Sequence, residues 1–127
     1  MKEIQTGSAW GLRSLLSQAV RAGDTLYISG QVARHADGRL VTENFEAEVR
    51  RVFDNIKAVI EAAGGSLRNV CKVTAYLAAP ELFEQFNAVY LTYFDHEPRP
   101  ARTTVCCQLP KPFLRVEVDA IAWLGRE

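Results

Sequence analysis

The chain has 127 residues, 48% of them hydrophobic and 24% charged, which fits a single globular domain over residues 1–127. Its 15 basic and 15 acidic side chains give a formal net charge of zero, without the positive excess of proteins that bind nucleic acid or anionic membranes. No stretch approaches the ~20 apolar residues of a membrane span, and the N-terminus lacks the apolar run of a signal peptide. We therefore expect a cytoplasmic protein with a small-molecule partner.

The first predicted strands surround a turn at residues 22–24 within QAVRAGDTLYISGQVA. In the second strand apolar Leu26 and Ile28 alternate with Thr25 and Tyr27, which indicates one face on a core and one on a more polar surface. An Asp-Gly pair at residues 37–38 then predicts a reversal of the chain.

A helix is predicted over residues 45–63, because apolar residues recur there every three or four positions. Asn44 is its expected N-cap, and Gly64 and Gly65 end it. NVCKVTAYLA, residues 69–78, follows as a strand. Pro80 then opens a second helix, with an apolar stripe formed by Leu82, Phe83, Phe86, Val89, Tyr90 and Phe94.

Two strands are predicted at the C-terminal end, one in EPRPARTTVCCQLPKP and one in FLRVEVDAIAWLG. The order of elements argues for an α+β fold with its helices on one face of the sheet. The other face would combine Tyr27, Tyr76, Cys106, Ile121 and Trp123 with charged neighbours. Such a mixed face is typical of a surface that packs against copies of itself, so we expect a homo-oligomer.

If the last two strands form a hairpin with residues 110–113 as its loop, Leu109 faces Leu114 and Thr104 faces Asp119. Arg102 then lies diagonal to Asp119 on the face opposite the helices. This register predicts a cation and a carboxylate in one pocket.

Each of these two residues has a structural and a functional interpretation. Arg102 is either a surface arginine, free or in an ion pair, or a two-point donor to a substrate carboxylate. Asp119 is either a solvated strand residue or a carboxylate that orients or deprotonates water. Cys106 and Cys107 are interpreted as packing residues, since no histidine is near in sequence to activate a thiolate. An odd number of cysteines and only two histidines predict neither a disulfide framework nor a metal site.

The chain from about Leu16 to Ala122 resembles the RidA/YjgF family of reactive-intermediate deaminases. The resemblance rests on LSQAVRAGDTLYISGQVA, FEAEVRRVFDNIKAVIEAAGGSLRNVCKVTAYL, FNAVYLTYF, RPARTTV, LPKP and VEVDAIA, in order and at matching spacing. It implies a chorismate-mutase-like fold, with a mixed sheet, two helices on one face and a trimeric barrel core. Three ligand sites would lie in the clefts between the subunits of a homotrimer.

The implied activity is hydrolysis of enamines and imines, such as 2-aminoacrylate and other 2-imino acids, to 2-keto acids and ammonia. This would be a deaminase of the 2-iminobutanoate/2-iminopropanoate type, a hydrolase acting on C–N bonds, and it requires no metal or cofactor.

The resemblance also implies roles for single residues. The family's substrate-gripping arginine falls on Arg102, and its SGQ glycine, which lets backbone approach the ligand, falls on Gly30. The asparagine beside the cleft falls on Asn87. The residue whose backbone carbonyl helps to hold the water falls on Thr104. The second acidic position of VEIEAIA, typically glutamate, is Asp119, which is assigned with Arg102 to catalysis.

Two further departures from the family pattern bear on the site. Leu16 stands where GPYSQ has a tyrosine over the cleft, and the run from arginine to Leu-Pro is one residue shorter than is common.

The leading hypothesis is a trimeric imine deaminase. The alternative is a non-catalytic trimer that binds small carboxylates such as 2-keto acids, and a nucleic-acid-directed activity is disfavoured by the zero net charge.

Overall fold

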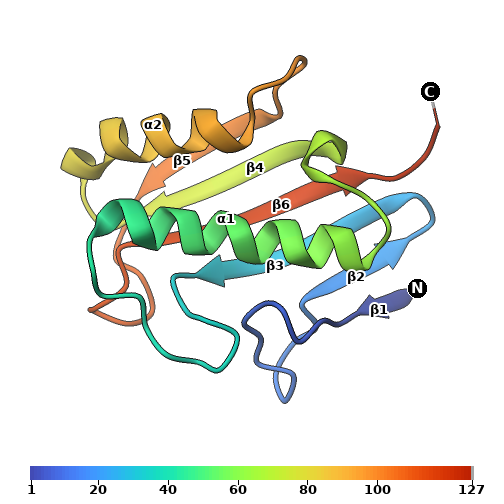
Figure 1. The fold of residues 1–127 in the computed structure, drawn as a ribbon, viewed down its shortest axis with the longest axis horizontal. Coiled ribbons are helices and arrows are strands. Elements are labelled where there is room, and N and C mark those ends of the chain that lie inside the picture. The colour runs from blue at the N-terminus through green and yellow to red at the C-terminus, as the bar shows by residue number, and fades with distance from the viewer. Residues whose placement is uncertain (127) are drawn as a thin grey trace.

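The computed structural model describes residues 1–126, which form one six-stranded sheet covered on one face by two helices (Figure 1). The strand order is β1-β2-β3-β6-β4-β5. The strands are β1 (Lys2–Ile4), β2 (Ala19–Ala22), β3 (Thr25–Val32), β4 (Val70–Leu77), β5 (Ala101–Cys106) and β6 (Val116–Trp123). All neighbours pair antiparallel except β4 and β5, which are parallel. The predicted α+β fold is confirmed.

The two α-helices begin and end close to the predicted positions. Helix α1 (Phe45–Ala62) is capped by Asn44, whose side chain accepts a hydrogen bond from the Ala47 N–H, and Gly64 at φ +88° follows its end. Pro80 opens a short 3-10 turn, η2 (Pro80–Leu82), which leads directly into α2 (Phe83–Tyr93). A second 3-10 turn, η1 (Leu67–Asn69), precedes β4.

The main core lies between the helices and the sheet. Alternate residues of β6 and β4 face it, as do the apolar stripes of both helices, and Phe53 of α1 packs against four aromatic rings of the second helical region: Phe86, Tyr90, Tyr93 and Phe94. Burying large aromatic and β-branched side chains on one face provides most of the driving force that holds helices and sheet together.

The face opposite the helices, called the open face below, is mixed in character as expected. Tyr27 and Trp123 are exposed there, and Tyr76 and Ile121 are partly buried. At one end of this face the segment after β5 packs back on the sheet, and a second apolar cluster forms from Val32, Leu109 and Leu114 with Trp10, Leu40, Tyr76 and Cys107.

The predicted hairpin between the last two strands is wrong. β5 does not pair with β6, because β4 lies between them and pairs with both. Asp119 faces Thr74 across β6 and β4, whereas Thr104 faces Ala75 across β4 and β5. The stretch between β5 and β6 is therefore a connection over an intervening strand, which local turn signals do not reveal. No helix within residues 1–126 is long and apolar enough to cross a membrane.

Candidate functional site

Arg102 lies in the edge strand β5 and points toward the helices, not toward the open face. It pairs with Val73, a fully buried residue on the helix side of β4. Its Nη2 donates a 2.6 Å hydrogen bond to Oδ1 of Asn87 in α2, and its guanidinium lies 4.7 Å from the centre of the Tyr90 ring. The aromatic face and the amide hold a cation that forms no ion pair with any residue in 1–126.

This environment suits Arg102 for binding an anion. The amide of Asn87 occupies one guanidinium nitrogen, so the remaining N–H groups are available to a carboxylate in two-point geometry. Thr104 lies two residues further along β5 on the same face and is partly buried. Three of the predicted site residues, Arg102, Asn87 and Thr104, therefore lie together, and we call them the cationic half-site.

A second group forms where β3 meets β6. The ladder between these strands is irregular between Ile28 and Gln31, and Gly30 lies in this bulge. A Cβ added to Gly30 would lie 2.4 Å from Oε2 of Glu117, so the absence of a side chain is what admits this carboxylate. Burial raises the pKa of the Glu117 carboxyl above its ordinary value, and the negative charge of Asp119 raises it further.

Asp119 is the next residue on the same face of β6. Its Oδ2 accepts a 3.2 Å hydrogen bond from the hydroxyl of Tyr76, and the Asp119 charge raises the pKa of that phenol. Gly30, Glu117, Asp119 and Tyr76 form what we call the acidic half-site. A carboxyl group with a raised pKa beside a second carboxylate is the arrangement expected of a general acid–base pair.

The two half-sites do not meet within one chain. Arg102 lies on the helix side of the edge strand, whereas Asp119 lies on the open face of β6, with β4 between them. The predicted pocket that joins Arg102 to Asp119 in one subunit is therefore wrong, for the same reason as the hairpin. Any site that uses both residues needs the cationic half-site of one copy and the acidic half-site of another.

A cavity of about 530 Å³ adjoins the acidic half-site on the open face. Glu117 is one of its lining residues, and apolar side chains supply most of the others: Trp10, Leu12, Val32, Pro110 and Leu114. Arg34 and Lys111 add two cations to its lining. The Arg34 guanidinium donates a 2.7 Å hydrogen bond to the Gly38 carbonyl and lies 5.7 Å from the centre of the Phe113 ring.

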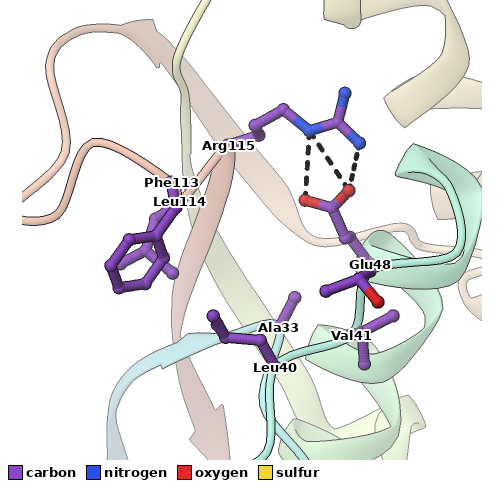
Figure 2. A pocket seen from close by; sticks show the side chains of 8 residues that line it. Ala33, Leu40, Val41, Glu48, Phe113, Leu114 and Arg115 are labelled. Carbon is purple, nitrogen blue, oxygen red and sulfur yellow. Dashed lines mark hydrogen bonds and ion pairs between the residues drawn. The ribbon is translucent and has the colours of Figure 1, made fainter.

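A smaller cavity of about 210 Å³, which also has Leu114 in its lining, is a weaker candidate (Figure 2). Its two charged side chains point toward one another, because Arg115 donates hydrogen bonds from Nε and Nη2 to the buried Glu48 carboxylate. A closed pair of this kind leaves neither partner free for a ligand. It ties the segment before β6 to the first turns of α1.

The cysteines are free thiols with different surroundings. Cys107 packs in the second apolar cluster, as predicted, whereas Cys106 is exposed, which contradicts the prediction that it packs. Cys106 also faces the helix side, in register with Leu77, and not the open face. Within residues 1–126 no group of three His, Cys, Asp or Glu side chains is placed to hold a metal ion.

Glu117 is the residue that the sequence reasoning missed. Both Glu117 and Asp119 fall on the open face by their alternation, and the role was assigned to Asp119. The distinguishing feature is the approach of Gly30 to Glu117, and this depends on the bulge between β3 and β6. Leu16, expected over the cleft, is 40% exposed and does not line this cavity, whereas Leu12, four residues earlier, does.

A family model described as endoribonuclease L-PSP matches residues 8–124. The chain belongs to this family, which is the RidA/YjgF family. Among curated relatives, a RutC family protein of Pyrococcus horikoshii is 44% identical over 109 residues, covering 84% of this chain and 85% of the relative. A protein of Dermatophagoides farinae named 2-iminobutanoate/2-iminopropanoate deaminase is 38% identical, covering 83% of this chain and 82% of the relative.

Solved structures of the family superpose closely on this fold. RidA from an Antarctic Psychrobacter has a TM-score of 0.90 and 40% identity, covering 97% of this chain and 99% of that structure. E. coli TdcF with bound serine has a TM-score of 0.89 and 29% identity, covering 98% and 100%. The predicted family and fold are confirmed.

Proposed function

We propose that this protein hydrolyses reactive 2-imino acids and their enamine tautomers to 2-keto acids and ammonia. The observation that carries the proposal is the Glu117 carboxyl, half-buried against Gly30, with a pKa raised by burial and by Asp119. A carboxylate whose pKa lies above its ordinary value accepts a proton from water more readily and can return it as a general acid. The relative named 2-iminobutanoate/2-iminopropanoate deaminase supports the same reaction class.

The proposed site combines two copies of the chain. Arg102 of one copy, held by Asn87, binds the substrate carboxylate, while Gly30 and Glu117 of another copy face the imine carbon. A homotrimer, as the resemblance implies, would form three such sites. The serine bound to the structurally similar TdcF is also an α-amino carboxylate, which supports an amino-acid-like ligand.

In the proposed reaction, Glu117 accepts a proton from water as the water oxygen bonds to the carbon of the protonated imine, and the C=N π electrons move to nitrogen. The resulting carbinolamine carries the amino group, the hydroxyl and the carboxylate on one carbon. Glu117 then returns its proton to nitrogen. As the C–N bond breaks and ammonia leaves, the hydroxyl proton passes to the Glu117 carboxylate and the keto group forms. Asp119, fixed by Tyr76, keeps the pKa of Glu117 raised, and the Thr104 carbonyl is proposed to help hold the water.

The test is the rate of keto-acid formation from freshly generated 2-imino acids, measured with wild type and Arg102→Lys. Lysine keeps the charge but loses the two-point geometry and the partner atom for Asn87, so we expect a loss on the order of 100-fold. Arg13→Lys, in an exposed side chain, is the matched control. Wild-type turnover by Arg102→Lys would refute the proposed carboxylate contact.

The alternative, a trimer that binds small carboxylates without turnover, uses the same Arg102. It predicts that wild type binds 2-keto acids but accelerates no hydrolysis. In that case Glu117→Gln would leave keto-acid binding nearly unchanged, because binding without turnover requires no proton transfer by Glu117. An enzyme with the proposed mechanism would instead lose turnover in Glu117→Gln while retaining an intact fold.

A further inference from the structure

We propose that the 530 Å³ cavity beside Glu117 is a side-chain subsite, and that the protein acts preferentially on 2-imino acids with large apolar side chains, such as those of leucine and phenylalanine. This inference rests on the proposed function, because it names the substrate class of the same site. It depends on the composition, size and position of one cavity.

The lining of the cavity favours an apolar occupant. Trp10, Val32 and Leu114 belong to the second apolar cluster, and Leu12 and Pro110 extend the same surface. The guanidinium of Arg34 is already engaged by the Gly38 carbonyl and the Phe113 ring. Lys111 is exposed, so its ammonium remains in water at the rim of the cavity.

The position of the cavity fits the geometry of the reaction. Glu117 belongs both to the cavity lining and to the acidic half-site beside Gly30. A substrate with its imine carbon at Glu117 and its carboxylate directed to Arg102 of another copy has one substituent left, the side chain. The apolar cavity beside Glu117 is the space that this substituent would enter.

The size of the cavity sets how strong a preference for large side chains we expect. At about 530 Å³ it exceeds the cavities beside Cys71, about 430 Å³, and beside Glu48, about 210 Å³, and it lies in the range of small-molecule sites. The methyl group of 2-iminopropanoate would leave most of it empty. Each buried methylene contributes about 0.8 kcal/mol, roughly fourfold in rate, so the three additional carbons of an isobutyl side chain give up to roughly 60-fold in kcat/KM.

The preference also identifies the class of reaction that supplies the substrate. Elimination of water or hydrogen sulfide from hydroxy or thiol amino acids leaves only short side chains on the resulting imino acid. Oxidation at Cα, with hydride transfer from the amino acid to a flavin or nicotinamide and loss of a proton from nitrogen, retains the whole side chain. A site that prefers leucine- and phenylalanine-sized side chains therefore serves amino-acid oxidation.

The experiment compares kcat/KM for imino acids generated by an amino-acid oxidase from alanine, leucine, phenylalanine and glutamate. Leu12 lines the cavity and is 41% exposed, so Leu12→Trp reduces the cavity without disturbing the core. Leu15, in the same loop but 79% exposed and outside the cavity lining, provides the matched control Leu15→Trp. We expect wild type and Leu15→Trp to prefer the leucine substrate over the alanine substrate at least tenfold, and Leu12→Trp to lose at least tenfold in this ratio.

Other results would overturn the inference in distinguishable ways. Turnover of the alanine substrate with no preference for larger ones, an unchanged ratio in Leu12→Trp, or a preference for the glutamate substrate would refute the apolar subsite but not the deaminase. If no imino acid is turned over, Trp10 fluorescence in a Trp123→Phe background reports keto-acid binding. Tighter binding of 4-methyl-2-oxopentanoate than of pyruvate would then retain the subsite, and equal binding would refute it together with the activity.

Discussion

Substitution of Gly30 by alanine is the most direct test of the acidic half-site. The added Cβ would lie 2.4 Å from Oε2, 3.0 Å from Cδ and 3.2 Å from Cγ of Glu117. Ordinary contact begins at about 3.4 Å, so the carboxylate oxygen must move by about 1 Å. Gly30 is not among the glycines with positive φ, so alanine fits the backbone conformation and the change acts through Glu117.

The expected effect is large on activity and small on stability. The obstructing atoms belong to the end of a flexible side chain, which can rotate away at little cost to the fold. A displacement of about 1 Å at a reacting group can reduce the rate by on the order of 100-fold. We therefore expect Gly30→Ala to reduce kcat for imine hydrolysis about 100-fold, with a free energy of unfolding within ~1 kcal/mol of wild type.

The assay follows keto-acid formation from a freshly generated 2-imino acid, with thermal unfolding measured on the same preparations. Gly7→Ala is the matched control, because nothing lies within 4 Å of a Cβ at that position. If Gly30→Ala retained activity within threefold of wild type, the close approach of Gly30 would not position Glu117, and the proposed role of Glu117 would lose its structural basis.

Two further predictions concern stability. Asn55 is fully buried in α1 and donates hydrogen bonds to the carbonyls of Val32 (3.4 Å) and Arg34 (2.9 Å). Asn55→Ala should therefore lower the free energy of urea unfolding by about 2 kcal/mol at fixed protein concentration, whereas Gln85→Ala, at an exposed position, should change it little. A loss under about 0.5 kcal/mol in Asn55→Ala would contradict this role. The folded-state pKa of Glu117 is raised above its unfolded value, so wild-type stability should fall as pH rises between the two values. Glu117→Gln should therefore gain stability over wild type as pH rises above about 4, the ordinary pKa of a glutamate. A pH-independent difference in unfolding free energy would refute the burial argument.

The elements were predictable because their signals are local. Asn44 and Gly64 delimit α1, Pro80 opens the second helical region, and the alternation in β6 assigns its two faces correctly. The pairing of β5 was not predictable in this way. A segment with prolines at both ends before an amphipathic strand resembles a hairpin, whereas the actual partner, β4, lies about 30 residues earlier in the sequence. Parallel strands are joined by a long crossover connection, so no local turn motif in the sequence indicates that they pair.

This single error explains most of the errors in the predicted site. Because β4 lies between β5 and β6, Arg102 lies on the helix side of the sheet and Asp119 on the open face. Cys106 lies on the helix side as well. The family pattern predicted Asn87 beside the cleft, and the structure shows that it accepts a hydrogen bond from Arg102. Glu117 was missed because its environment depends on a bulge in β3, three strands earlier in the sequence, where Gly30 removes the steric barrier to its carboxyl.

The proposed division of the site between two copies of the chain would account for two other features of the structure. β5 is an edge strand whose outer backbone groups lack a partner strand within residues 1–126, and the open face carries exposed Tyr27 and Trp123. A contact that brings the acidic half-site of one copy to the β5 edge of another would cover the edge and complete the site at once. Because the two contacting surfaces differ, the arrangement is head-to-tail, and it leaves no surface unpaired only if the copies close into a ring. The trimer implied by the family resemblance would be such a ring, in which catalysis and assembly depend on the same interface.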